Sequence, residues 1–155
     1  TTDIAKEGLF NILQNNLVLD ELKVLDLFGG TGCISYEMAS RGAPEITTVE
    51  KDPKMFEFIK KTAEELKFEN ISVVKGDVFR FIETTPQQYD FIFAGPPYAL
   101  ANIDDLPLKI FEKGILRPGG WFVLEHTPRN NYKKFAHYKT ERNYGTTIFS
   151  VFINS

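Results

Sequence analysis

The feature that most constrains the fold of this chain is the alternation of short apolar runs with segments of helical period. The runs are rich in β-branched residues and end in turn signals, which is typical of buried strands. The segments between them repeat apolar residues every three or four positions, which indicates amphipathic helices. Because parallel strands joined through helices use right-handed crossovers, the pattern predicts a doubly wound, mainly parallel α/β sheet covered on both faces.

The expected elements follow from these runs. Five parallel strands are predicted at residues 23–28, 46–50, 71–74, 89–94 and 121–125. Helices are predicted at residues 3–15, 33–40, 53–67, 78–84 and 106–116, the last stopped by residues 118–120. Segments 138–144 and 146–153 flank Gly145 like the arms of a closing hairpin, which adds an antiparallel strand at or near one edge. The expected core faces of the first and third helices are Ile4, Leu9, Ile12 and Leu13, and Met55, Phe56, Ile59, Ala63 and Leu66.

Length and composition predict one domain spanning residues 1–155. The chain is 43% hydrophobic, which suffices for one well-buried core. No stretch approaches the roughly 18–20 apolar residues of a membrane span, and the start of the chain does not resemble a signal peptide. A single cysteine, Cys33, excludes an internal disulfide and a multi-cysteine metal site. We therefore expect a cytoplasmic protein with neither a metal nor a membrane partner, and nothing in the sequence demands more than a monomer.

The net charge is an argument against a nucleic-acid partner. The chain carries a formal charge of −3 with a pI near 5.5, whereas phosphate backbones are usually met by a basic surface. A modest basic cluster does occur late in the chain, at Arg129, Lys133, Lys134 and Lys139. A solvated surface is its default interpretation, and contact with RNA phosphates is the second.

The turn after the first strand is the first candidate binding element. Asp26 precedes a glycine-rich segment with Phe28, Gly30 and Gly32, and glycines let the backbone pass close to a ligand. A carboxylate at Asp26 would repel a pyrophosphate and attract a ligand that carries an ammonium and a sulfonium. The alternative is a tight strand–helix turn in which Asp26 caps backbone N–H groups.

Carboxylates also follow the next two strands. Glu50 ends the second strand, where it can accept hydrogen bonds from ribose hydroxyls, and Lys51 adjoins it. Asp77 ends the third strand and can accept from an adenine amino group, while Val78 and Phe79 pack on the ring. The alternatives are a solvated charge at Glu50 and a helix N-cap at Asp77, and the two roles of Asp77 can coexist through different oxygens.

The most specific signal is the run Gly95, Pro96, Pro97 and Tyr98 after the fourth strand. Two prolines hold the backbone extended, with carbonyls that no local N–H claims. A tyrosine beyond them offers a flat face on which a base can stack. Acceptors at this point can turn the lone pair of an exocyclic amine toward a methyl donor. The alternative is a stiffened loop with Tyr98 as a core aromatic; His126, after the fifth strand, is a further candidate lining residue.

Residues 26–32 resemble the first motif of class I methyltransferases, and residues 95–98 resemble their (Asn/Asp)-Pro-Pro-Tyr amino-methylating motif. More narrowly, the chain resembles the RsmD family, bacterial methyltransferases that act on a guanine N2 in 16S ribosomal RNA. Residues 1–3, 6–7, 9–13, 40–43 and 142–147 carry this resemblance, which spans essentially the whole chain. It implies a Rossmann-like, seven-stranded fold, S-adenosylmethionine as cofactor, and the small ribosomal subunit as partner. It also implies that Gly95 to Tyr98 are catalytic and that the earlier motifs bind the cofactor.

Two departures from the family matter. Family members normally begin with a basic, glycine-rich segment before the Thr1–Thr2–Asp3 stretch, and its absence would account for the acidic balance. Gly95 stands where the motif has Asp or Asn, so one acceptor for the target amine is missing, while the Pro96 carbonyl remains. Water or a carboxylate such as Glu125 can substitute.

Several alternatives stay open. They are methylation of another nucleic-acid base, a weak or inactive RNA-binding relic, a small-molecule N-methyltransferase, and a nicotinamide-dependent oxidoreductase. The oxidoreductase suits Gly30 to Gly32 and Glu50, but Asp26 and the proline–tyrosine loop argue against it.

Overall fold

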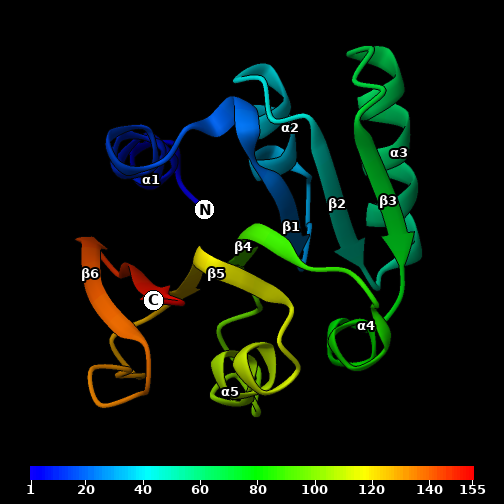
Figure 1. Ribbon diagram of the computed structural model, residues 1–155. Helices are drawn as coiled ribbons and strands as arrows, with labels where there is room; N and C mark the ends of the chain where they lie inside the picture. The colour runs from blue at the N-terminus through cyan, green and yellow to red at the C-terminus, as the bar shows by residue number, and fades with distance from the viewer.

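The computed structural model describes residues 1–155 and contains one seven-stranded sheet in the order β3-β2-β1-β4-β5-β7-β6 (Figure 1). The first five strands run parallel, β7 pairs antiparallel with β5, and β6 pairs antiparallel with β7 at the edge. The predicted doubly wound fold with a closing hairpin is therefore confirmed. The strands are β1 (Lys23–Leu27), β2 (Glu45–Glu50), β3 (Ile71–Lys75), β4 (Tyr89–Ala94), β5 (Leu116–His126), β6 (Tyr138–Tyr144) and β7 (Thr147–Ile153).

Helices cover both faces of the sheet. In Figure 1, α1, α2 and α3 lie on one side of the strands, and α4 and α5 lie on the other. Side chains alternate along each strand, so that Val24 packs in one hydrophobic cluster and its neighbour Leu25 in the other. The helices are α1 (Asp3–Asn16), α2 (Cys33–Ser40), α3 (Pro53–Glu65), α4 (Val78–Thr84) and α5 (Asp105–Glu112), with a short 3-10 helix η1 (Leu19–Glu21).

Two of the predicted helix faces are partly wrong. Ile4 is 74% exposed, because α1 buries Ala5 and Phe10 together with Leu9 and Leu13. The helix approaches the closing hairpin closely at Gly8, where a Cβ atom would lie 2.1 Å from the Tyr144 hydroxyl. The predicted core faces also contain residues that are only partly buried, namely Ile12, Met55 and Phe56, and Leu66 is 51% exposed.

The last predicted helix is too long at its carboxyl end. It stops at Glu112, and Gly114 follows with a left-handed φ of +65°. Leu116 then pairs with Tyr89 as the first residue of β5, and the register shifts before the next pairs. Residues 118–120 therefore form an irregularity inside the strand rather than a helix stop.

None of the helices has the combination of length and apolar composition that crossing a membrane requires. Side chains cap the starts of three helices, and one of them, Asp77, was offered as a cap by the sequence. Thr2 accepts a hydrogen bond from the Ala5 N–H, Asp52 from Lys54 and Asp77 from Arg80. The last two caps fix the loops that follow β2 and β3, which line the site described next.

Candidate active site

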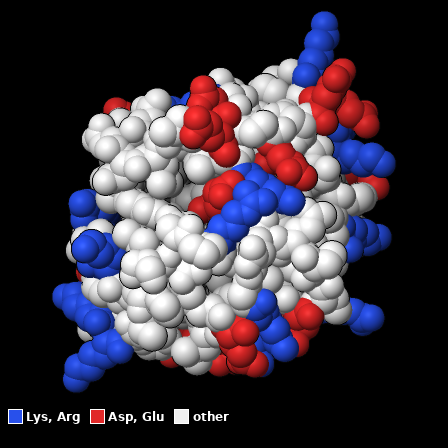
Figure 2. Space-filling view, viewed as in Figure 1, with Lys and Arg blue, Asp and Glu red and all other residues white.

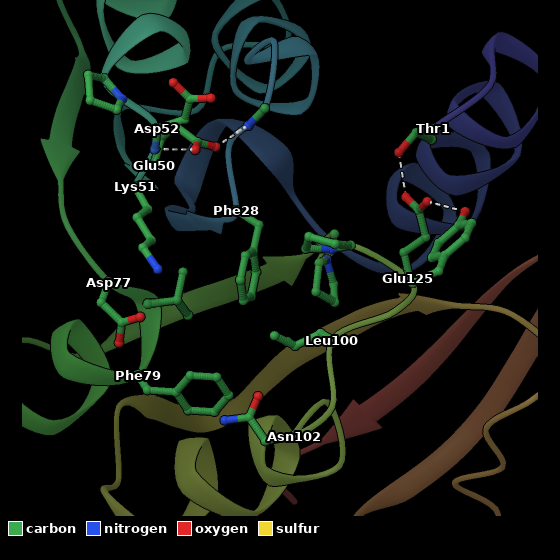
Figure 3. Close-up of a pocket in the computed structure, with 17 residues that line it drawn as sticks. Thr1, Phe28, Glu50, Lys51, Asp52, Asp77, Phe79, Leu100, Asn102 and Glu125 are labelled. Carbon is green, nitrogen blue, oxygen red and sulfur yellow. Dashed lines mark hydrogen bonds between the residues drawn. The ribbon is translucent and has the colours of Figure 1, made fainter.

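A cavity of about 970 Å³ lies where the parallel strands end (Figure 3). Most of its lining residues lie at or just beyond the carboxyl ends of β1 to β5, and Thr1 joins them from the start of the chain. The volume lies within the roughly 300–1,000 Å³ typical of small-molecule sites. Of the residues predicted for the site, all but Asp26, Gly32 and His126 line it: Phe28, Gly30, Glu50, Lys51, Asp77, Val78, Phe79, Gly95, Pro96, Pro97 and Tyr98. Such a position, at the carboxyl edge of a doubly wound sheet, is where these folds bind ligands.

The turn after β1 requires glycine at particular positions. A Cβ atom at Gly32 would lie 2.5 Å from the Tyr36 ring, and the backbone there has a φ of +85°. A Cβ atom at Gly29 would lie 2.4 Å from Thr48 Oγ1. The turn therefore packs closely against side chains of α2 and β2. This packing fixes the position of Phe28 and Gly30, which form one wall of the cavity.

Asp26 lies beneath this turn and does not line the cavity. Its side chain is 1% exposed and accepts a hydrogen bond from Ser35 Oγ at 2.7 Å. Burial raises the pKa of this carboxyl to about 7, and the charge of Glu50 adds to the effect. The alternating pattern of β1 turns the Asp26 side chain toward α2. No contact between Asp26 and the cavity is seen, so a direct contact with a bound cation stays a prediction.

Glu50 connects two of the loops around the cavity. Its Oε1 accepts a hydrogen bond from the Gly30 N–H, and its Oε2 accepts one from the Asp52 N–H, both at 2.8 Å. Because a carboxylate can accept about four hydrogen bonds, Glu50 retains capacity for a ligand hydroxyl. Figure 3 shows Lys51 and Asp77 on the same side of the cavity as Glu50.

Asp77 has the capping role that the sequence offered as an alternative. Its Oδ2 accepts a hydrogen bond from the Arg80 N–H at 3.0 Å. The residue still lines the cavity, as do Val78, which is buried, and Phe79, which packs partly against the core. Capping and ligand contact are therefore compatible at this position.

Tyr98 follows the two prolines and is 41% exposed, so it is not a core aromatic. Its hydroxyl donates to Glu125 Oε2 at 2.6 Å and lies 3.3 Å from Thr147 Oγ1. Burial and the hydrogen bond to Glu125 raise the pKa of the Tyr98 hydroxyl. The ring is thus tethered at its tip, with part of its surface open.

Glu125, which the sequence suggested only as a substitute acceptor, is a full member of the cavity wall. Its side chain also accepts a hydrogen bond from the Thr1 hydroxyl. The neighbouring His126 is buried and faces the other side of the sheet, where its Nε2 lies 2.7 Å from Ser150 Oγ. The expectation that His126 lines the site is wrong, because adjacent residues of a strand point to opposite faces.

Sequence reasoning missed some lining residues: Thr1, Asp52, Pro53, Leu100 and Asn102. The N-cap signal at Asp52 and Pro53 was available, since both open the helix after Glu50. Thr1 gave no such signal, because it reaches the site from the opposite end of the chain.

The cavity has two chemically different ends, which Figure 3 separates. The Glu50 end comprises Phe28, Gly30, Glu50, Lys51, Asp52 and residues 77–79. The Glu125 end comprises Thr1, residues 95–98 and Glu125. Carboxylates at the Glu50 end favour a ligand with hydroxyl or amino donors and disfavour a pyrophosphate.

The family described as "Conserved hypothetical protein 95" matches residues 1–153. The chain is 26% identical to "Ribosomal RNA small subunit methyltransferase D" of Buchnera aphidicola subsp. Baizongia pistaciae, over 92% of this chain and 76% of that protein. It is 30% identical to YlbH of Bacillus subtilis, over 81% of this chain and 70% of that protein.

Solved structures have the same fold. A conserved hypothetical protein from Streptococcus pyogenes superimposes with a TM-score of 0.86 at 27% identity, covering 97% of this chain and 95% of that one. An RNA methyltransferase from Salinibacter ruber, solved in complex with S-adenosyl-L-homocysteine, superimposes with a TM-score of 0.76 at 18% identity. The second match covers 99% of this chain and 92% of that one and bears on the fold alone.

Proposed function

Because the chain belongs to the family described as "Conserved hypothetical protein 95", we propose that it is an S-adenosylmethionine-dependent methyltransferase that modifies the N2 amine of a guanine in 16S ribosomal RNA. One observation carries the proposal: the glycine turn with Glu50 and the run from Gly95 to Tyr98 open onto one cavity. Methyl transfer needs a donor and an amine in one enclosed space, so this arrangement meets its first geometric requirement. The relatives' names supply the acceptor class.

The residues of the Glu50 end fit S-adenosylmethionine. Glu50 keeps acceptor capacity for ribose hydroxyls, and Asp77 keeps an oxygen for the adenine amino group. Phe28, Val78 and Phe79 offer apolar surface to the adenine ring. The buried Asp26 lies beneath the turn and contributes negative potential toward a cationic donor when ionised. When bound, the donor supplies a methyl group activated by its sulfonium.

The Glu125 end fits the acceptor. Tyr98 presents part of its ring for stacking with a base that has left its helix. The Pro96 carbonyl accepts one hydrogen of the amine, which directs the nitrogen lone pair toward the donor. Transfer then forms one N–C bond, breaks the bond between methyl and sulfur, and releases one proton from nitrogen. The residues of both ends come from one chain, so a single copy suffices for the reaction.

An exposed basic surface supports an RNA partner despite the net charge of −3. Figure 2 shows Lys and Arg side chains gathered over β6 and the loop that precedes it. None of the basic residues in this cluster takes part in an ion pair, so their charges are available to phosphates: Arg129, Lys133, Lys134 and Lys139. A ribosomal substrate is also consistent with the expected cytoplasmic location.

The test is transfer of labelled methyl from S-adenosylmethionine to small ribosomal subunits that lack the modification. We expect label on guanine N2 after digestion to nucleosides, at one position per subunit. Subunits that already carry the methyl group serve as the control and should take up no label. Absence of label with the unmodified subunits, despite measurable binding of S-adenosylhomocysteine, would favour an RNA-binding relic or a different acceptor.

A further inference from the structure

The side chain missing at Gly95 leaves a specific place unoccupied in the acceptor half of the cavity. A Cβ atom at Gly95 would lie 3.7 Å from Glu125 Oε1 and 3.1 Å from the Phe93 ring. Ala94 pairs with Leu124 in the sheet, so the two following residues stand side by side at the carboxyl edge of β4 and β5. The carboxylate nearest to position 95 therefore comes from the neighbouring strand.

The Glu125 carboxylate lies next to this unoccupied place and is held there by its neighbours. The residue is 4% exposed, lines the cavity and takes part in no ion pair. Tyr98 donates to its Oε2 and Thr1 to its Oε1, which fixes its orientation from two sides. Each oxygen keeps a further lone pair. A buried carboxylate without a cation, next to an amine-binding motif, suits a group on which positive charge develops.

We infer that Glu125 is a catalytic residue that replaces the Asp or Asn side chain missing from the motif and accepts a hydrogen bond from the target amine. This inference rests on the proposed function and deepens it. The Pro96 carbonyl accepts a hydrogen bond from one N2 hydrogen, and Glu125 Oε1 accepts a hydrogen bond from the other. As the nitrogen bonds to the methyl carbon, the electron pair of the methyl–sulfur bond passes to sulfur. The amine then loses one proton to Glu125, which releases it to water.

The first test compares single-turnover methyl transfer by the natural chain and by Glu125→Gln. Glutamine keeps the shape of the side chain but removes its negative charge and its capacity to take up a proton from the amine. We expect the rate to fall roughly 100-fold, within the range seen when a group that stabilises developing charge is removed. The Kd of S-adenosylhomocysteine should stay unchanged. A rate within about threefold of the natural chain would overturn the inference.

A rescue experiment separates a catalytic role from a structural one. Gly95→Asp introduced into Glu125→Gln should restore the rate at least tenfold, because it returns a carboxylate to the same place. Gly95→Ala in that background is the matched control, since it adds the Cβ atom without the acceptor, and it should restore nothing. Tyr98→Phe removes the tether and keeps the carboxylate, so its loss should be much smaller than that of Glu125→Gln. Equal losses would show that Glu125 acts only through Tyr98 and would contradict the inference.

Nucleotide binding tests amine recognition without methyl transfer. Guanosine 5′-monophosphate and inosine 5′-monophosphate differ only in the 2-amino group, and both can be titrated against the chain saturated with S-adenosylhomocysteine. The natural chain should prefer the guanosine nucleotide, and Glu125→Gln should lose that preference. If the preference depends on Glu125 but ribosomal subunits take up no methyl, the proposed substrate is wrong and the role of Glu125 stands. If the natural chain shows no preference, the inference fails whatever the subunits do.

Discussion

The two ends of the cavity are built in different ways. At the Glu50 end, contacts are made between loops that follow adjacent strands, as in the hydrogen bonds from Gly30 and Asp52 to Glu50. At the Glu125 end, Glu125 accepts hydrogen bonds from Thr1, which lies 124 positions away in the sequence, and from Tyr98, which lies 27 positions away. The first end is therefore a product of local motifs, and the second depends on the whole sheet being assembled.

This contrast indicates which end of the cavity tolerates an exchange of residues. A site made of local motifs is reproduced wherever the strand–turn–helix units are kept, which suits a common cofactor. A site assembled from distant segments can exchange one residue for another on a neighbouring strand. In our inference Gly95 and Glu125 are such a pair, because the acceptor that the motif places directly after β4 is supplied by Glu125 on β5.

The largest expected effect concerns Asp26, beneath the Glu50 end. Its folded pKa of about 7 lies above the ordinary value of 3.8, so between these values the folded state holds a proton that the unfolded chain has lost. The free energy of unfolding should therefore fall as the pH rises from 4 to 7 and then level off. Asp26→Asn should remove this slope and gain up to a few kcal/mol at pH 8, since one pKa unit corresponds to about 1.4 kcal/mol.

Urea unfolding of both proteins at several pH values measures this difference. Parallel profiles for the natural chain and Asp26→Asn would show that the carboxyl titrates alike in both states.

Glu50→Ala should weaken binding of the cofactor at the Glu50 end and leave the Glu125 end unchanged. It removes two hydrogen bonds to a charged group and opens the contact between the turns after β1 and β2. The Kd of S-adenosylhomocysteine, measured by calorimetry, should rise roughly 10- to 100-fold. Glu57→Ala, on the exposed side of α3, is the control and should bind like the natural chain. An unchanged Kd in Glu50→Ala would remove this residue from the donor site.

Tyr98→Ala should weaken binding of the RNA substrate at the Glu125 end and leave binding of the methyl donor unchanged. Loss of the stacking face should raise the KM for the RNA substrate by about tenfold, as base–aromatic stacking contributes about 1–3 kcal/mol. The Kd of S-adenosylhomocysteine should stay within twofold. A variant with weaker donor binding and an unchanged KM would reverse the assignment of the two ends.

The smallest effect is expected from the basic surface outside the cavity. Lys133→Ala combined with Lys134→Ala should weaken RNA binding a few-fold and lower the slope of log K against log salt by about 1–2. Lys60→Ala with Lys61→Ala, both exposed on α3, provides a matched loss of charge. Equal effects of the two pairs would show that only the net charge matters.

The sequence predicted the fold and which strand ends line the cavity, for a physical reason. Glu50 and Asp77 sit at strand ends, and a parallel sheet brings strand ends to one edge. The sequence could not predict that Leu116 opens β5 or that Thr1 reaches Glu125, because both depend on packing between distant segments. The alternation along β1 determines the face of the sheet to which the Asp26 side chain points. Its near-complete burial beneath the glycine turn is seen only in the structure.

The most direct test of the account is a crystal structure of the chain with S-adenosylhomocysteine and guanosine 5′-monophosphate. We expect the adenosyl group between Glu50 and Asp77, and the guanine on Tyr98 with its 2-amino group at the Pro96 carbonyl and Glu125. A guanine bound elsewhere, or one whose amine points away from Glu125, would contradict the account.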